Sequence, residues 1–153
     1  MVTFFSARTP GSVVLGKLCA AIFACGLEAA VLVTAARADI RITHDEGGLQ
    51  DVYRQRVNAA RASGERVLID GFCSSSCTLY LTLPRVCATA RAELLFHAPF
   101  DVRTGLPTPA EAERLLAIYP PGIRSWIIRH GGLSHIPIKL RGAELAQLLP
   151  RCR

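Results

Sequence analysis

The stretch Gly71-Phe-Cys-Ser-Ser-Ser-Cys77 lies between two apolar runs and decides how this part of the chain folds. The run before it, Val67-Leu68-Ile69, is typical of a short buried strand that glycine brings to an end. The run after it, Leu79-Tyr80-Leu81, follows three serines, and serine is a preferred N-cap of helices. The pattern therefore predicts a strand, a tight turn, and a helix that begins near residues 74–76.

A turn of this kind gives a serine hydroxyl a setting suited to catalysis. The hydroxyl would lie at the positive end of a helix, beside backbone N–H groups that can stabilise an oxyanion. The next predicted strand, residues 93–96, delivers His97, and imidazole is the usual base for a serine nucleophile. The spacing alone favours the plainer alternative that the serines cap a helix and that His97 ends a strand.

The first 38 residues have the pattern of a secretory signal. Arg8 and Lys17 precede an apolar stretch over residues 18–36, and Ala36-Arg37-Ala38 places small residues where signal peptidase needs them. We expect cleavage before Asp39 and export, in a bacterium to the periplasm.

Two alternatives to a cleaved signal remain open. Glu28 interrupts the apolar stretch and would be costly inside a membrane, but residues 18–36 could still form an uncleaved inner-membrane anchor. Cys25 lies in a poor match to a lipidation motif. The remaining residues, 39–153, are the length of a single domain.

Cysteine usage agrees with export, because four cysteines remain after the signal: Cys73, Cys77, Cys87 and Cys152. Four cysteines in an exported chain of this length predict two disulfides. Of the three possible pairings, we favour Cys73–Cys152 with Cys77–Cys87. A metal site built from Cys73, Cys77 and a histidine is the competing interpretation, but the spacing is loose for zinc. We therefore expect no metal.

The charge of the chain excludes few partners by itself. The whole chain has a net charge of +6, and its cations are scattered and lack interleaved aromatic residues. This distribution is typical of a solvated surface and gives no support to nucleic-acid binding.

Strand and helix patterns alternate along the rest of the chain. Residues 39–43 predict a strand, and residues 49–63 predict a helix whose apolar face comprises Leu49, Val52, Tyr53, Val57 and Ala60. Gly64 is placed to end that helix. The order of strands and helices up to residue 96 predicts an α/β layered core. Loops that follow parallel strands meet at one edge of the sheet, so the Gly47-Gly48 loop, the serine turn and His97 would lie together.

The C-terminal third predicts mainly helices. Residues 100–108 have no periodicity and predict a loop that would cover a site beside His97. Helices are predicted over residues 108–118, 123–129 and 142–149.

Three motifs together resemble the ClpP/crotonase-like superfamily, and in particular small exported bacterial proteins with a Gly-x-Cys-x-Ser-x-Cys segment. These motifs are that segment at residues 71–77, Gly47-Gly48 before it, and His97-Ala98-Pro99 after it. The resemblance covers residues 39–99 well and the remainder loosely. It implies a ClpP/crotonase-like core of βαβ units with C-terminal helices.

The resemblance also implies roles for residues. The nucleophile lies four residues after a glycine in the Clp protease proteolytic subunit, so Ser75 matches it, with His97 as the base and the N–H groups of Gly48 and Ser76 as the oxyanion hole. The family's third triad member is a late aspartate. The comparable residues here, 137–141, contain no carboxylate. Asp101 and Glu144 are the candidate substitutes.

Lys139 and His44 are two further candidates, the first through the resemblance and the second through its position. A related group of membrane-associated peptidases uses a Ser/Lys dyad, and Lys139 is the only lysine outside the predicted signal. His44 stands beside the glycine loop and is a candidate lining residue of the same cleft.

We therefore expect an exported serine hydrolase that acts on a peptide or acyl bond and needs no cofactor. The alternative is a catalytically inactive relative that binds a ligand or protein in the same cleft, or a structural disulfide module of the cell envelope. Members of the family commonly assemble, which makes a homo-oligomer an expectation of the resemblance. An exported chain has no supply of ATP, which argues against processive protein degradation.

Overall fold

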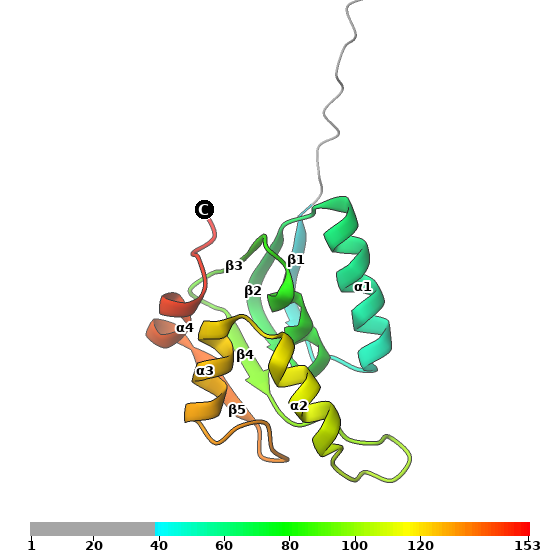
Figure 1. Ribbon diagram of the computed structural model, residues 1–153. Coiled ribbons are helices and arrows are strands. Elements are labelled where there is room, and N and C mark those ends of the chain that lie inside the picture. The colour runs from blue at the N-terminus through cyan, green and yellow to red at the C-terminus, as the bar shows by residue number, and fades with distance from the viewer. Residues whose placement is uncertain (1–38) are drawn as a thin grey trace, which may run out of the picture. The chain divides into compact units, whose positions relative to one another are not determined.

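The computed structural model describes residues 39–153, which form a mixed five-stranded sheet with helices (Figure 1). The predicted α/β class is confirmed at this level. The predicted signal, residues 1–38, lies outside the described residues. The elements in chain order are β1 (Ile40–Asp45), α1 (Gln50–Ser63), β2 (Val67–Ser74), the 3-10 helix η1 (Ser75–Thr82), β3 (Val86–Ala88), β4 (Glu93–Phe96), α2 (Pro109–Ile118), α3 (Pro121–Arg129), β5 (Ile138–Arg141) and α4 (Gly142–Leu148).

Strand β2 is the centre of the sheet. It pairs in parallel with β1 on one side, and on the other side its first half pairs with β3 and its second half with β4. Strand β5 is antiparallel to β4 and closes that side. Because β1, β2 and β4 run in the same direction, the loops that leave their carboxyl ends emerge at one edge of the sheet.

Gly71 lies inside β2 and does not end it, contrary to the sequence prediction. Strand β2 continues to Ser74, five residues past the predicted end. A β-carbon added to Gly71 would lie 2.0 Å from the Thr43 carbonyl oxygen of β1. Glycine is therefore needed here for close approach of two strands, next to the register shift between Ile42 and His44. The helix predicted after the serines is present as a 3-10 helix.

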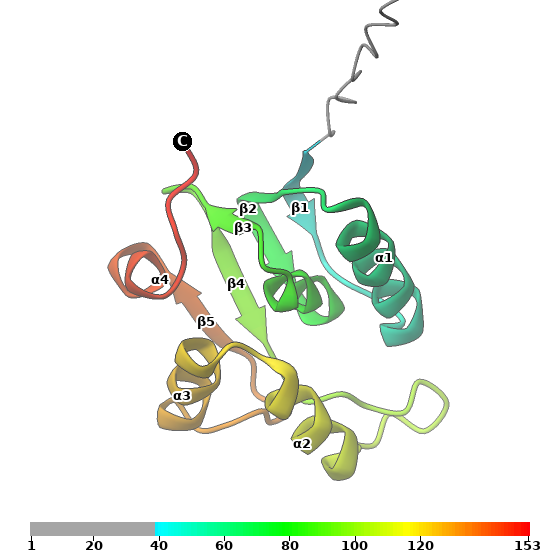
Figure 2. The ribbon, with the colours of Figure 1, turned by 45° about the horizontal axis from the view of Figure 1, so that its top comes forward.

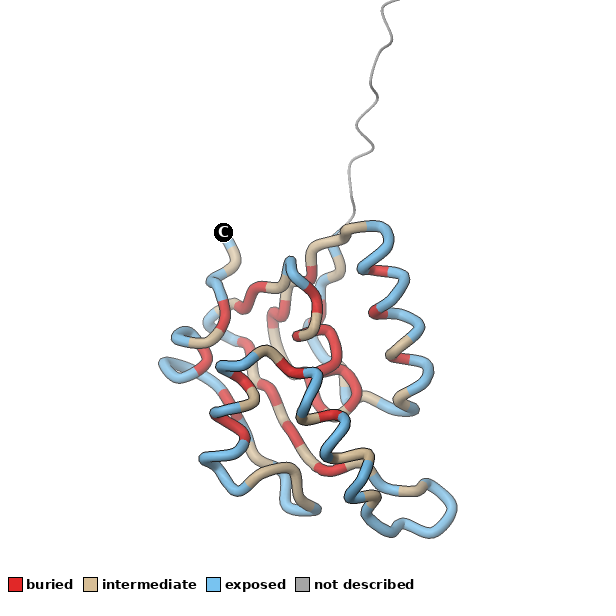
Figure 3. Tube along the Cα trace, in the orientation of Figure 1, coloured by how far each residue is buried: buried red, intermediate tan, exposed pale blue. Residues whose placement is uncertain are grey.

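The core lies between the sheet and the helices, as the burial pattern in Figure 3 shows. Its fully buried side chains include Ile69, Leu94, Phe96, Ile123 and Ile127. Helix α1 contributes Tyr53, Val57 and Ala60, and it ends at Gly64 with a left-handed φ of 67°, as predicted.

Two residues of the predicted apolar face of α1 are not in the core. The side chains of Leu49 and Val52 are exposed at the start of the helix. The face was therefore predicted correctly for its later turns and wrongly for its first turn.

Within residues 39–153 two disulfides are present, and the favoured pairing was wrong. The bonds join Cys73 to Cys77 and Cys87 to Cys152. The chain reverses after β2, which brings Cys73 beside Cys77. The Cys152 N–H donates to the Ala88 carbonyl oxygen at 3.1 Å, so the C-terminus lies along β3 and next to Cys87. Two disulfides indicate an oxidising, non-cytoplasmic location. Among residues 39–153, no helix is both long and apolar enough to span a membrane.

Figure 2 shows η1 beside α1, and the loop between β4 and α2 extending away from the sheet.

Candidate functional site

Ser75 stands at the turn between β2 and η1 in a strained backbone conformation. Its φ is 55°, and no other residue except glycine has a positive φ within residues 39–153. Such a conformation costs about 1–3 kcal/mol and persists only where the surroundings enforce it. The Cys73–Cys77 disulfide closes a covalent ring around this turn and is one such constraint.

The glycine loop packs directly against the serine turn. A β-carbon on Gly47 would lie 2.6 Å from the Ser74 carbonyl oxygen and 2.7 Å from the Ser75 β-carbon, so no larger residue fits there. The Ser76 hydroxyl donates to the Gly48 carbonyl oxygen at 2.7 Å. The two loops that sequence reasoning placed at one edge of the sheet therefore form a single unit.

Asp45 and Tyr53 hold the glycine loop from the other side. The Gly47 N–H and the Tyr53 hydroxyl both donate to Asp45 Oδ1, at 2.8 and 2.5 Å. Burial, followed by the hydrogen bond to Asp45, raises the pKa of Tyr53 to about 12. This phenol therefore remains a hydrogen-bond donor at any physiological pH.

A buried hydroxyl pair fixes the carbonyl group of Ser75. Thr78 Oγ1 donates to the Ser75 carbonyl oxygen at 2.6 Å and lies 2.6 Å from the Tyr119 hydroxyl. The threonine hydroxyl has one proton, which it donates to the Ser75 carbonyl, so it accepts a hydrogen bond from the Tyr119 hydroxyl. Burial raises the pKa of Tyr119, which keeps this donor protonated.

This bond also orients the Ser76 N–H. The Ser75 carbonyl and the Ser76 N–H belong to one planar trans peptide unit, so they point in opposite directions. Since Thr78 holds the carbonyl toward the protein interior, the N–H is directed away from that interior. Neither the Ser76 N–H nor the Gly48 N–H finds a hydrogen-bond acceptor among residues 39–153. Both groups remain available to a ligand.

His97 follows β4 and lies in the same cleft as Ser75. Its Nδ1 is 2.8 Å from the Ala98 carbonyl oxygen, an acceptor that requires the proton on Nδ1. The neutral ring therefore has a free lone pair on Nε2, as a general base needs. Within the described residues, Ser75 makes no direct hydrogen bond to His97. Catalytic hydrogen bonds are often long or poorly aligned in the absence of substrate.

The candidate third triad members do not reach His97. The Asp101 carboxylate accepts the N–H groups of Arg103 and Thr104 at 2.8 and 3.2 Å, inside its own loop. The Glu144 carboxylate lies 3.9 Å from Nε2 of His130. Both carboxylates have local partners, so the carbonyl of Ala98 occupies the place that a carboxylate takes in a triad.

The other candidates are also placed elsewhere. The Lys139 ammonium pairs with Glu93 across β4 and β5 at 3.1 Å. The His44 ring stacks on Phe72 with centroids 5.3 Å apart, and His44 does not line the cleft. Cys73 and Cys77 are bonded to each other, so they are not metal ligands. Residues 39–153 contain no group of three or more His, Cys, Asp or Glu side chains placed to hold a metal ion.

The cleft that joins these residues has a volume of about 1240 Å³. Ser75, Ser76, Gly48 and His97 line it, and so do residues of the loop that was expected to cover the site. Its exposed apolar walls are Leu49, Val52, Phe100 and Val102. The sequence patterns did not predict that Asp45, Tyr53, Thr78 and Tyr119 support the site, because these roles depend on contacts between distant segments.

No protein-family model, curated protein or solved structure matches this chain.

Proposed function

We propose that this protein is an exported serine hydrolase of the ClpP/crotonase-like type that acts on a peptide or acyl bond. The observation that supports this most is the left-handed backbone of Ser75, at a strand-to-helix turn between two free N–H groups. A strained serine turn beside free backbone donors is the usual setting of a nucleophile and its oxyanion hole.

In the proposed reaction, the Ser75 oxygen attacks the carbonyl carbon of the substrate while His97 Nε2 takes the hydroxyl proton. The Gly48 and Ser76 N–H groups hold the oxyanion. The leaving group then takes the proton from His97, and an acyl group remains on Ser75. Water, activated by the same imidazole, releases the acid.

The proposed location follows from the two disulfides and from the signal pattern. Strand β1 begins at Ile40, one residue after the expected cleavage site, so cleavage before Asp39 would leave the sheet intact. N-terminal sequencing of the exported protein would test this, and a mature chain that begins inside β1 would contradict it.

A fluorophosphonate probe tests the nucleophile. We expect the purified protein to be labelled at one site, which peptide mapping places at Ser75. Ser75→Ala abolishes labelling, and His97→Gln slows it by about 10²-fold or more, since general-base catalysis contributes about 10²- to 10⁴-fold. Ser63→Ala is the matched control on an exposed serine at the end of α1 that lies opposite the glycine loop, and it should label normally. Labelling of a folded Ser75→Ala variant at the wild-type rate would refute the proposal.

The second candidate is a catalytically inactive binding module, favoured by one observation: His97 is supported by a backbone carbonyl and not by a carboxylate. A carboxylate stabilises the imidazolium that forms during attack, and a carbonyl does so less. Under this alternative, Ser75 does not react with the probe, and Ser75→Ala leaves ligand binding unchanged.

A further inference from the structure

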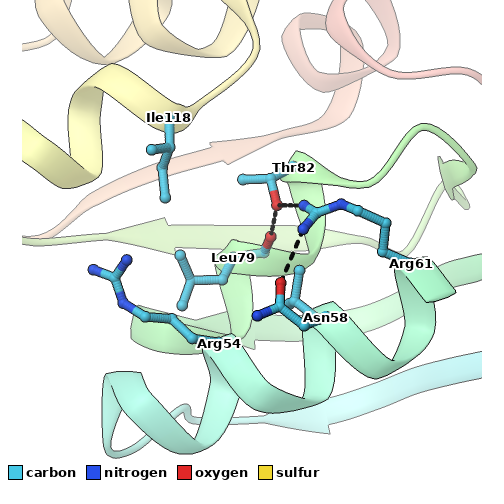
Figure 4. Close-up of a pocket in the computed structure, with 7 residues that line it drawn as sticks. Arg54, Asn58, Arg61, Leu79, Thr82 and Ile118 are labelled. Atoms are coloured by element: carbon cyan, nitrogen blue, oxygen red, sulfur yellow. Dashed lines mark hydrogen bonds between the residues drawn. The ribbon is translucent and has the colours of Figure 1, made fainter.

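A second pocket of about 430 Å³ lies between α1, η1 and the end of α2 (Figure 4). Its lining residues are Arg54, Val57, Asn58, Arg61, Leu79, Thr82 and Ile118. It shares only Arg54 with the cleft of Ser75. Its volume lies in the range of small-ligand sites, about 300–1,000 Å³.

The floor of this pocket is apolar. Val57 and Leu79 are buried core residues, and Ile118 adds a half-exposed aliphatic side chain from α2. In Figure 4, Leu79 lies between Arg54 and Arg61, with Ile118 above it. A flexible aliphatic chain would exclude water from this surface.

The Arg61 guanidinium is fixed at one end of the pocket. It donates to Asn58 Oδ1 at 2.9 Å and to Thr82 Oγ1 at 3.3 Å. The Thr82 hydroxyl gives its own proton to the Leu79 carbonyl oxygen at 2.8 Å, so its lone pairs face the arginine. Both acceptors are neutral, and no carboxylate of residues 39–153 forms an ion pair with Arg61. The guanidinium retains three N–H donors and its full charge.

Arg54, at the other end, is already paired with the Glu111 carboxylate, which also pairs with Arg114. Its guanidinium bonds Glu111 at 2.5 Å and Gln50 at 3.2 Å. The pocket is therefore polarised, with one free, oriented cation at Arg61 and an apolar floor that leads away from it. An anionic group joined to an aliphatic chain matches both features.

We propose that this pocket binds an aliphatic carboxylate, with the carboxylate on the Arg61 guanidinium and the chain along Val57 and Leu79. Planar guanidinium groups match carboxylates in a bidentate arrangement. Two sources share this chemistry: a free fatty acid, and the C-terminal residue of a peptide with an aliphatic side chain. The site does not depend on the hydrolase proposal.

Calorimetric titrations of the purified protein at low salt test the site. The probes are octanoate for the fatty acid, N-acetyl-leucine for the peptide terminus, and octanol as a neutral analogue. We expect at least one carboxylate to bind at least about 10-fold more tightly than octanol, because hydrogen bonds to charged groups contribute about 1.5–3 kcal/mol. Tighter binding of octanoate identifies the fatty acid as the source, and tighter binding of N-acetyl-leucine identifies the peptide terminus.

The Arg61→Gln variant should weaken binding of the carboxylate by about 10- to 100-fold. Arg56→Gln is the matched control, since Arg56 lies on the same helix over the Tyr53 ring and outside the pocket. Circular dichroism verifies that both variants fold. Three results would each overturn the proposal: no binding of either carboxylate, equal binding of octanol, or unchanged affinity in a folded Arg61→Gln variant.

Discussion

Replacement of Thr78 by valine removes one hydroxyl and leaves the side-chain shape nearly unchanged. In the native protein this hydroxyl bonds both the Ser75 carbonyl and the Tyr119 hydroxyl, and Thr78 is only 1% exposed. The variant leaves the buried Tyr119 hydroxyl without a partner and removes the side-chain bond to the Ser75 carbonyl. One unpaired buried group costs about 1–3 kcal/mol, so we expect the free energy of unfolding to fall by about that amount.

The local effect on the proposed site is separate from this loss of stability. Without the bond from Thr78, the peptide unit between Ser75 and Ser76 loses one of the three constraints on it, the others being the disulfide and the approach of Gly47, and it can rotate further. The Ser76 N–H then loses its orientation toward the oxyanion. Loss of one oxyanion donor slows acyl-transfer enzymes by about 10²- to 10³-fold, and we expect fluorophosphonate labelling to slow by a similar factor.

Tyr119→Phe is the matched control for this effect. It removes the other hydroxyl of the buried pair but leaves the bond from Thr78 to the Ser75 carbonyl, so labelling should slow by less than about 10-fold. The assay measures labelling rates under conditions where urea titration shows both variants to be folded. If folded Thr78→Val labels as fast as wild type, or if the two variants slow equally, then Thr78 does not position the oxyanion hole.

Three further predictions concern the fold. Gly71→Ala places a β-carbon 2.0 Å from a carbonyl oxygen of β1, so we expect the free energy of unfolding, measured with urea, to fall by about 3 kcal/mol. An unchanged urea midpoint would contradict this. The Asp70 pKa is held below 3.8, chiefly by the hydrogen bond from Arg91. The ionised Asp70 carboxylate therefore makes its full contribution to stability above that pH, and this contribution is lost as the pH falls. Between about pH 4 and pH 2, the free energy of unfolding should fall less steeply in Asp70→Asn than in the wild type. Replacement of Cys87 and Cys152 by serine opens a loop across 65 residues and should cost about 4 kcal/mol, measured by urea unfolding under non-reducing conditions.

The elements that sequence patterns predicted well are those with local signals. The later turns of α1 and its end at Gly64 follow from apolar spacing and from the left-handed conformation that glycine tolerates. Gly71 shows where local reasoning fails. A glycine that ends a strand and a glycine that admits a neighbouring strand look alike in sequence, and only the 2.0 Å approach from Thr43 distinguishes them.

The site divides in the same way. Ser75, Ser76, Gly48 and His97 were predicted from motifs, and all four line one cleft. The groups that hold these four residues were not predicted. No local pattern predicts a hydrogen bond between residues 41 positions apart, such as the bond between Thr78 and Tyr119. The disulfide pairing also depended on where the C-terminus lies, and the spacing of the cysteines does not predict that position.

The distribution of these constraints gives a way to separate the two proposed functions. The disulfide, the approach of Gly47 and the bond from Thr78 all act on the backbone at Ser75, whereas His97 is held by one bond to its neighbour Ala98. The rigid part of the site is thus the pair of N–H donors. A hydrolase needs these donors together with the Ser75 hydroxyl and the imidazole, but a module that binds a carbonyl or carboxylate group needs the donors alone. Ligand binding that survives Ser75→Ala and His97→Gln but fails in folded Thr78→Val would therefore identify a binding site, and loss of turnover in all three variants would identify an enzyme.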